Sequence, residues 1–409
     1  MKAITKLKPK SISRRFSNCA QGNVGVAFAF ALVPLLAAAG AAVDYESAFG
    51  QQTKLQAFVD STALAAASGA TESVSEKNVV AKAFINSEFS TITPRVVVNG
   101  DQVKVSVSQD YETAFMKIVG IDTVSINVTA TAIAKSTPVC ILALDPSATD
   151  ALKIWGSSSQ VVAKDCVVHS NSKAASGMSS TSNAISTAAV FCSSGGASAG
   201  QFDPPPKTFC NSVKDPYVGL PVPSVGSCDQ TNLSISSGRY SLRPGVYCGG
   251  LKITGGDVNL TPGTYIMKDG DFSVGGSVAN IRGVNVTIYL YGDTSSVSVV
   301  GGAVIELSAP PSGPYEGMVY VQNPSFGKTL TSKFSGNSDT KIVGAGYFPT
   351  QTLDVGGTAD FDINSPYMAF VAQNLEFHGN GSLTMNLDPA GSGYKLNIPR
   401  QYDGARLIK

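Results

Sequence analysis

The 409-residue sequence has few charged residues, since Asp, Glu, Lys and Arg together make up 14% of it. It has one Trp and two His, and it contains no Cys-x-x-Cys pair. A low charge density of this kind favours many short strands joined by tight turns over a helical enzyme. Two His are too few for a metal site built mainly from histidine ligands. The missing Cys-x-x-Cys pair argues against a zinc ribbon and a redox dithiol.

The common nucleotide-binding and hydrolase motifs are also missing. No P-loop, no Gly-x-Gly-x-x-Gly before a helix, no Gly-x-Ser-x-Gly and no His-Glu-x-x-His occurs. We therefore expect no cofactor and no small-molecule substrate. Beyond residue 43 the chain carries 24 basic against 29 acidic residues. Nucleic acid is not an expected partner, because phosphate binding needs a concentrated basic surface.

One long apolar run is present near the N-terminus. Residues 24–43 are 20 uncharged, mostly apolar residues, and about 20 are needed to cross a bilayer as a helix. Six basic residues precede the run and Asp44 follows it. The positive-inside rule then predicts a single-pass helix in a bacterial inner membrane, with residues 1–23 cytoplasmic and the bulk of the chain periplasmic or surface-exposed. The small residues at 37–42 leave a cleaved secretory signal open as an alternative.

Six of the seven cysteines follow this apolar run. Both alternatives export this part of the chain to an oxidising compartment, where an even number of cysteines favours disulfides. Six cysteines allow up to three disulfides in any of 15 pairings. The candidates are Cys140, Cys166, Cys192, Cys210, Cys228 and Cys248.

Residues 44–136 are predicted to form a helical stem and a small α+β head close to the membrane. Apolar residues at three- and four-residue intervals predict helices over 44–70 and 75–88. Alternating apolar runs on both sides of Asn99-Gly100 predict a β-hairpin. A further strand is expected over 124–133.

Residues 137–400 lose the helical pattern and gain a short repeat, apolar-x-apolar-x-Gly. Copies that follow directly lie 21, 25 and 22 residues apart, a period typical of a solenoid. We predict a right-handed parallel β-helix, with a β-sandwich as the alternative. Within it, residues 171–235 are expected to be a disulfide-pinned loop, and residues 401–409 a C-terminal tail. The six copies begin at Leu152, Leu251, Phe272, Val297, Leu353 and Leu375.

The N-terminal third carries an ordered set of short motifs. These are Gln21-Gly22-Asn23-Val24, the small-residue apolar run, Val43-Asp44-Tyr45, Leu55-Gln56, Asp60 with Ala63-x-Ala65-Ala66-Ala67, and the later Cys140-Ile-Leu-Ala-Leu-Asp145-Pro-Ser. In this order they resemble TadG-like proteins of the Tad (tight adherence) Flp-pilus assembly system. The resemblance implies a non-enzymatic, membrane-anchored component that helps to build or decorate an adhesive pilus. Its expected partners are the inner-membrane bilayer and other pilus-assembly proteins or pilins.

The sequence departs from the pilin pattern at one position. Pilins of such systems are cut after a Gly that is followed five residues later by Glu, whereas Gly22 is followed by Ala27. Without that carboxylate we expect no processing at Gly22 and a permanent anchor.

Two metal sites come into question. Some members of the wider group carry a metal-dependent adhesion site, Asp-x-Ser-x-Ser, and Asp145, Ser147 and Thr149 follow an apolar strand with a similar spacing. The later chain lacks the alternating strands and helices of that fold, so we interpret these residues as a turn. Cys166 and His169 would point to opposite faces of a strand, so we expect a disulfide cysteine and an unrelated histidine.

Paired carboxylates raise the alternative of an extracytoplasmic polysaccharide-active β-helix enzyme. Asp269 with Asp271, and Asp360 with Asp362, are i, i+2 pairs that would share one strand face. Such enzymes tend to expose several Trp, and this chain has one. We therefore predict no catalytic residues, and we keep a secreted surface adhesin as a further alternative.

Overall fold

The protein is described by a computed structural model in which the chain divides into two compact units. Unit 1 comprises residues up to 135 and from 402 onward, and unit 2 comprises residues 136–401. The described residues are 23–68, 74–89, 92–99, 101–156, 160–198, 200–276, 278–335, 339–357, 360–361, 367–379, 382–385 and 398–408.

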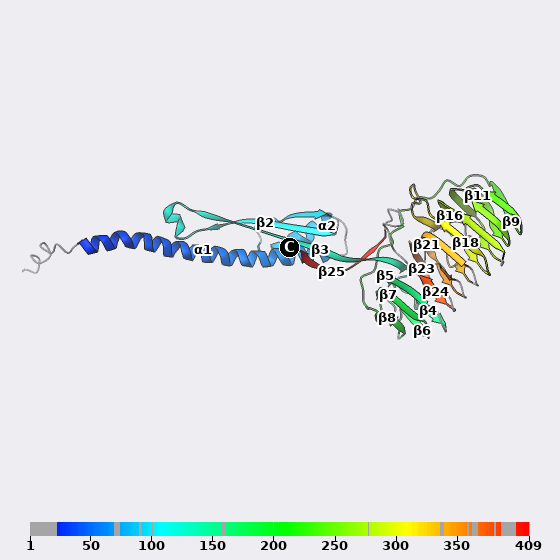
Figure 1. Ribbon diagram of the computed structural model, residues 1–409, viewed down its shortest axis with the longest axis horizontal. Coiled ribbons are helices and arrows are strands. Elements are labelled where there is room, and N and C mark those ends of the chain that lie inside the picture. Colours follow the sequence, from blue (N-terminus) through cyan, green and yellow to red (C-terminus); the bar gives the residue numbers. More distant parts are fainter. Residues whose placement is uncertain are drawn as a thin grey trace, which may run out of the picture. The chain divides into compact units, whose positions relative to one another are not determined.

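Unit 1 begins with one long helix, α1 (Asn23–Ser68), which includes Pro34. Residues 24–39 are exposed throughout, and the first buried residue is Gly40. From there a four-residue spacing (40, 44, 48) marks the face of the helix that packs inside the unit. The predicted helix and its apolar start are therefore one continuous element (Figure 1).

Three antiparallel strands pack against α1. The hairpin predicted around Asn99 is present, with β1 (Arg95–Asn99) and β2 (Gln102–Glu112) in register from Asn99↔Gln102 onward. The strand β3 (Thr123–Ala143) pairs with all of β2, and the short 3₁₀ helix η2 (Met116–Val119) lies between them. The period-2 alternation of Val103, Val105 and Val107 buries one face of β2 against the helix.

Two further elements complete unit 1. The helix α2 (Val74–Asn86) buries Ala81 and Ile85 in the same core. The C-terminal residues expected to form a tail instead form the strand β25 (Arg400–Ile408), whose Ala405 packs against that core.

Unit 2 consists of parallel strands in three ladders. In spatial order, the first ladder contains β10 (Arg239–Leu242), β12 (Gly256–Leu260), β15 (Ala279–Gly283), β18 (Val304–Ser308), the start of β21 (Asp339–Val355), β22 (Asp360–Phe361), β24 (Ser382–Thr384), β5 (Gln160–Ser170), β7 (Ile185–Ser193) and β8 (Gln201–Asp203). The second contains β9 (Gln230–Ile235), β11 (Gly245–Ile253), β13 (Gly263–Lys268), β16 (Val286–Tyr291), β19 (Met318–Gln322), β21, β23 (Met368–His378), β3, β5 and β7. The third contains β9, β11, β14 (Phe272–Val274), β17 (Val297–Val299), β20 (Thr331–Phe334), β21, β23, β4 (Leu152–Gly156) and β6 (Met178–Ser182).

The chain visits the three ladders in turn, and together they form one closed parallel sheet around a single core. The prediction of a mainly β protein with an N-terminal apolar helix is confirmed. The alternative of a β-sandwich does not fit unit 2, because sandwiches are built from antiparallel sheets and the described ladders of unit 2 are parallel.

All six copies of the sequence repeat lie on the third ladder. Most successive copies pair directly, for example Leu251↔Phe272 and Phe272↔Val297, whereas β20 lies between the copies that begin at Val297 and Leu353. Their apolar residues face the core, and the closing Gly takes positive φ in five copies, which is a conformation that side chains disfavour. In the copy that begins at Leu251, the positive φ falls one residue later, at Gly256.

The spatial order of the strands differs from their order in the chain. The last copy of the repeat pairs with the first, with Leu375↔Leu152 and Phe377↔Ile154 in register. The strands from β9 to β24 therefore come first in the stack, and those from β3 to β8 continue it (Figure 1). The two halves of the sheet meet at β23, although more than 200 residues separate the paired copies.

Residues 204–229 carry the chain from β8 back to β9. The side chain of Asn171 exchanges two 2.8 Å hydrogen bonds with the backbone of Val213. Farther along, the Tyr347 hydroxyl donates to the Asp215 carboxylate at 2.7 Å, and the Tyr315 hydroxyl donates to the Pro221 carbonyl at 2.7 Å. These partners lie on different strands and turns, so the segment follows the stack for much of its length.

The prediction of a loop over 171–235 is therefore wrong outside residues 204–229. The strands β6, β7, β8 and β9 all lie in it. The repeat was not recognisable there because small polar residues occupy buried positions, as Ser180 and Ser186 do.

Three disulfides form, each between consecutive cysteines. They are Cys140–Cys166, Cys192–Cys210 and Cys228–Cys248. The first joins neighbouring strands, β3 and β5. The other two tie the beginning and the end of the 204–229 segment to β7 and β11.

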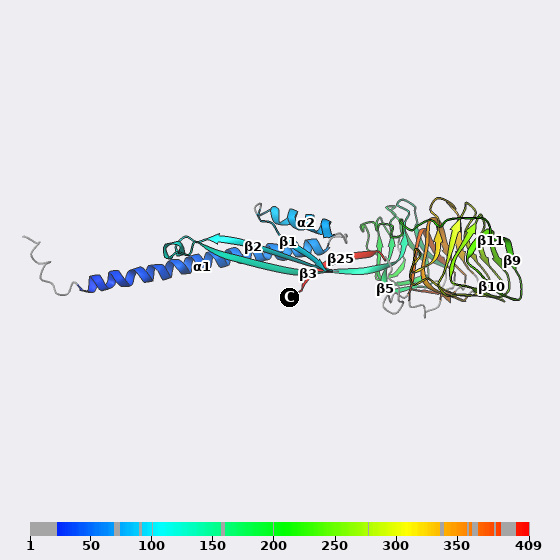
Figure 2. The same cartoon turned by 90° about the horizontal axis from the view of Figure 1, so that it is seen from above.

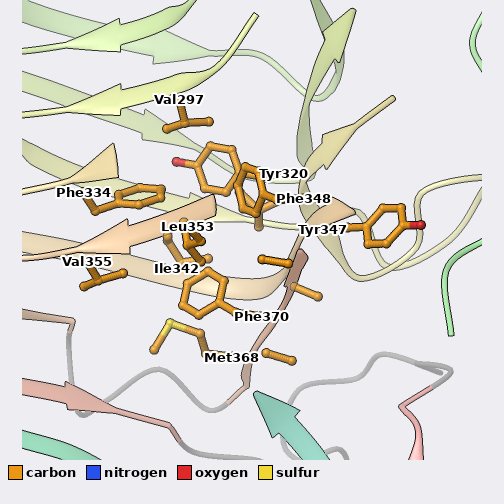
Figure 3. Packing of buried hydrophobic residues seen from close by; sticks show 14 of the residues in the cluster. Val297, Tyr320, Phe334, Ile342, Tyr347, Phe348, Leu353, Val355, Met368 and Phe370 are labelled. Atoms are coloured by element: carbon orange, nitrogen blue, oxygen red, sulfur yellow. The ribbon is translucent and has the colours of Figure 1, made fainter. Parts of the chain in front are cut away.

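Aromatic side chains from the second and third ladders fill the core. Figure 3 shows Tyr320 between Phe334 and Phe348, whose ring centroids lie 5.6 and 6.2 Å from its own. All three are fully buried, although they come from different strands. No single strand could bury such rings alone, and only the closed sheet encloses them.

Replacing Cys228 and Cys248 together by Ser is expected to lower the free energy of unfolding by about 3 kcal/mol, since the disulfide closes a loop of 20 residues. Protease cleavage within 204–229 should also become faster, because one end of this segment is released. Denaturant unfolding and limited proteolysis of the oxidised protein measure both effects. Cys19→Ser is the control, and unchanged stability and cleavage in the double variant would contradict this role of the disulfide.

Candidate functional site

The first part of α1 carries a long run of exposed apolar side chains. Val24, Phe30 and Leu36 are 73%, 78% and 62% exposed. The helix is long and apolar enough to cross a membrane, by length and composition. So much apolar surface is unfavourable in water, and a membrane anchor and a secretory signal both have a helix of this kind.

Where α1 enters unit 1, it contacts the loop between β2 and β3. The Asp44 carboxylate accepts hydrogen bonds from the backbone N–H groups of Ala114, Phe115 and Met116 at 3.0, 2.8 and 2.6 Å. One turn earlier, a Cβ on Gly40 would lie 2.6 Å from the Phe115 Cβ, so only Gly permits this close approach. Burial opposes ionisation of Asp44, but the three N–H donors outweigh it and lower its pKa.

Asp145 and Ser147 come together in the turn after β3. The Asp145 Oδ1 accepts from the backbone N–H of Ser147 at 2.9 Å and from that of Ala148 at 2.7 Å. Its Oδ2 accepts from the Gln373 amide at 3.3 Å. Burial acts to raise the pKa of the Asp145 carboxyl. The hydrogen bonds to its charged form together have the larger effect, so its pKa lies below the usual value. Thr149 makes no hydrogen bond to Asp145 among the interactions that the structure describes.

Cys166 and His169 have different partners and do not form a common site. Cys166 is bonded to Cys140, as the sequence predicted for a disulfide cysteine. The His169 ring is fully buried, with Nδ1 3.1 Å from the Gln401 amide oxygen and Nε2 3.4 Å from the Ser194 hydroxyl. Burial lowers the pKa of His169 to about 4. In the described part of the chain, no group of three or more His, Cys, Asp or Glu could hold a metal ion.

The Asp269 and Asp271 carboxylates do not share a strand face. Both lie in the turn between β13 and β14, where Asp269 has a positive φ of 52°. The Asp271 Oδ1 accepts from the Ser296 backbone N–H at 2.9 Å and from its hydroxyl at 2.7 Å, which stabilises the neighbouring turn. Asp362 and the side chain of Asp360 lie outside the described residues.

A charged aromatic cluster crosses the outer face of the third ladder. The Trp155 ring stacks on His378 with centroids 4.6 Å apart, and the Lys153 Nζ lies 5.6 Å from the Trp155 centroid. The His378 Nε2 lies 2.7 Å from the Asp354 Oδ1. No motif in the sequence indicates this cluster, although Trp155 and His378 each directly precede the Gly that closes a copy of the repeat.

These features define a mainly β protein with three disulfides and an exposed apolar N-terminal helix. Residues 22–69 match the protein family described as "Putative Flp pilus-assembly TadE/G-like", and these residues are almost the same as those of α1. The predicted resemblance is therefore confirmed, and the chain carries a TadE/G-like segment at its N-terminus. No curated protein and no solved structure matches the chain.

Asp44→Asn is expected to loosen the loop after β2, because a neutral amide has one acceptor oxygen for three backbone donors. Amide hydrogen exchange of residues 114–116 should become faster while that of β1 is unchanged. Mass spectrometry of a peptide covering residues 113–122 measures it. Asp110→Asn is the matched control, since Asp110 bonds only the Ser125 hydroxyl of the same hairpin at 2.6 Å among the described contacts. Equal exchange in both variants would contradict the role of Asp44.

His169 should make unit 2 less stable in acid. Its folded-state pKa lies below the usual value of 6.5, so protonation favours the unfolded chain. The stability is fully present above pH 6.5 and falls as the pH approaches about 4. Between pH 7 and 4.5 the loss should be roughly 2 to 3 kcal/mol. His169→Gln should remove this part of the pH dependence in urea unfolding, and full retention of it in the variant would refute the assignment.

Proposed function

We propose that this protein is a membrane-anchored, non-enzymatic component of Tad/Flp pilus assembly that exposes its β-rich unit for protein–protein contacts or adhesion. The observation that carries the proposal is the coincidence of the TadE/G-like segment, residues 22–69, with the exposed apolar helix α1. Residues 24–39, which lie within the matched segment, expose apolar side chains that a lipid bilayer would cover.

The anchor is proposed to cross the bacterial inner membrane once, with the N-terminus in the cytoplasm. The six basic residues before the apolar run and the acidic residues after it support this orientation. The three disulfides of unit 2 support its export, because disulfides persist in oxidising compartments.

Unit 2 is proposed to be a solenoid of the parallel β-helix type. The three parallel ladders, the repeat of 21 to 25 residues and the stacking of all six copies support this interpretation. Such a stack presents long flat faces to partners such as pilins or other assembly proteins. On one face, the partly exposed Trp155 ring that stacks on His378 offers a contact point, because aromatic residues are enriched at protein interfaces.

A non-enzymatic role is favoured over a polysaccharide-active enzyme by the use of the described carboxylates. Asp145 and Asp271 accept hydrogen bonds within turns. Asp354 lies within 4 Å of His378 and Lys333. A pair of carboxylates on opposite sides of a cleft, as glycoside hydrolysis requires, is not formed by Asp269 and Asp271.

Deletion of the gene is expected to abolish surface pili and attachment, and the full-length protein should restore both. A variant with a short linker in place of residues 137–399 tests the role of unit 2. This replacement is feasible because the Val139 N–H donates to the Pro399 carbonyl at 2.8 Å and the Arg400 Nη1 lies 3.1 Å from the Ser136 hydroxyl. It should reach the membrane without restoring attachment.

Trp155→Ser is a milder variant that alters one surface of unit 2 and leaves its core. Electron microscopy of pili, attachment assays and membrane fractionation provide the measurements. Normal piliation and attachment in the deletion strain would reject the assembly role. A mature chain without residues 1–42 in the culture medium would instead support the secreted adhesin.

A further inference from the structure

The tip of the hairpin between β2 and β3, residues 113–122, exposes an unusual set of apolar side chains. Ile118 is 83% exposed, Val119 is 61% exposed, and Phe115 and Ile121 are 49% and 43% exposed. From 113 to 121 the only charged residue is Lys117, whereas Glu112 and Asp122 directly flank this stretch. Exposed apolar patches of this kind mark interaction sites.

Two contacts fix the position of this tip along α1. Gly40 permits the close approach of Phe115, and Asp44 binds the backbone N–H groups of Ala114, Phe115 and Met116. The tip therefore lies beside the turn of α1 that contains residues 40–44. Both views of the ribbon show the hairpin of β2 and β3 running beside α1. The N-terminal part of the helix extends beyond the tip of the hairpin (Figures 1 and 2).

The length of the free helix places this turn at the membrane surface. Residues 24–39, which make no buried contact, extend over about 24 Å at about 1.5 Å per residue. The hydrocarbon core of a bilayer is about 30 Å thick. The remaining distance of about 6 Å corresponds to residues 40–43, which are the residues beside the hairpin tip.

Charged and aromatic residues of α1 follow directly after the apolar run. On α1 the first acidic residues after the apolar run are Asp44, whose charge the tip itself binds, and the exposed Glu46. The exposed rings of Tyr45 and Phe49 stack 6.5 Å apart just beyond, where aromatic side chains prefer the membrane–water interface. The long side chain of Lys117 could reach lipid phosphates from the tip.

We propose that the hairpin tip inserts Phe115, Ile118 and Val119 into the outer leaflet of the membrane that α1 spans, as a second membrane contact of unit 1. This inference rests on the proposed membrane anchor. The apolar surface of the tip continues that of residues 24–43, so one bilayer covers both. The tip would resist tilting of unit 1 about the single helix, because it adds a second point of attachment.

Depth-dependent fluorescence quenching tests the proposal on the full-length protein in phosphatidylcholine nanodiscs. Trp155→Phe removes the only Trp, and single Trp residues are then introduced by Ile118→Trp, Val33→Trp and Val79→Trp. Val33 lies in the middle of the apolar run, and Val79 is an exposed residue of α2, 64% exposed, that serves as the control in water.

Lipids brominated near the headgroup end of the acyl chain should quench the Ile118→Trp variant at least two-fold and more than lipids brominated near the methyl end. The Val33→Trp variant should show the reverse preference, and Val79→Trp should not be quenched. If Ile118→Trp behaves like Val79→Trp while Val33→Trp is quenched, the tip does not insert although the anchor does. If Val33→Trp is not quenched either, the anchor itself is wrong. Far-UV circular dichroism verifies that the variants fold.

Discussion

The register between the first and last parts of unit 2 is the interaction on which the rest of this unit depends. Leu375 pairs with Leu152 and Phe377 pairs with Ile154, and Phe370 pairs with Ile141 on the second ladder. Without these pairs, β23 and β4 would each present an unpaired edge and expose their apolar faces. The core is continuous because this junction closes it, although no local sequence signal indicates that the first and last copies of the repeat pair.

The long connection and its two disulfides follow from the same register. Since β8 ends one side of the stack and β9 begins the other, residues 204–229 must return along the sheet. This connection is rich in Pro and polar residues, and it is held by Cys192–Cys210, by Cys228–Cys248 and by Tyr347 and Tyr315 between them. A connection of this length without strands would lose much entropy on ordering, which explains why covalent links fix both of its ends.

The register also places the entry and the exit of unit 2 together. The Val139 N–H donates to the Pro399 carbonyl. The residues where the chain enters unit 2 therefore lie next to those where it leaves. This explains why residues beyond 401 contribute a strand to unit 1 instead of a tail. An insertion of this kind leaves the hairpin of β2 and β3, and its contact with α1, independent of how unit 2 winds.

The sequence alone determined the features that residues close together in the chain encode. These features are the apolar run of 24–43, the alternation of β2, the Asn99 hairpin, the apolar-x-apolar-x-Gly repeat and the disulfide state of six cysteines. Each is a local pattern or follows from an even number of cysteines after the apolar run. Only the tertiary structure decided which copy stacks on which, since all copies have nearly equivalent apolar faces and the closing pairs join residues far apart in the chain. For the same reason the Trp155–His378 cluster, the pairing of the cysteines and the position of the hairpin tip beside Gly40 and Asp44 could not be derived. Each depends on contacts between distant segments that packing alone brings together.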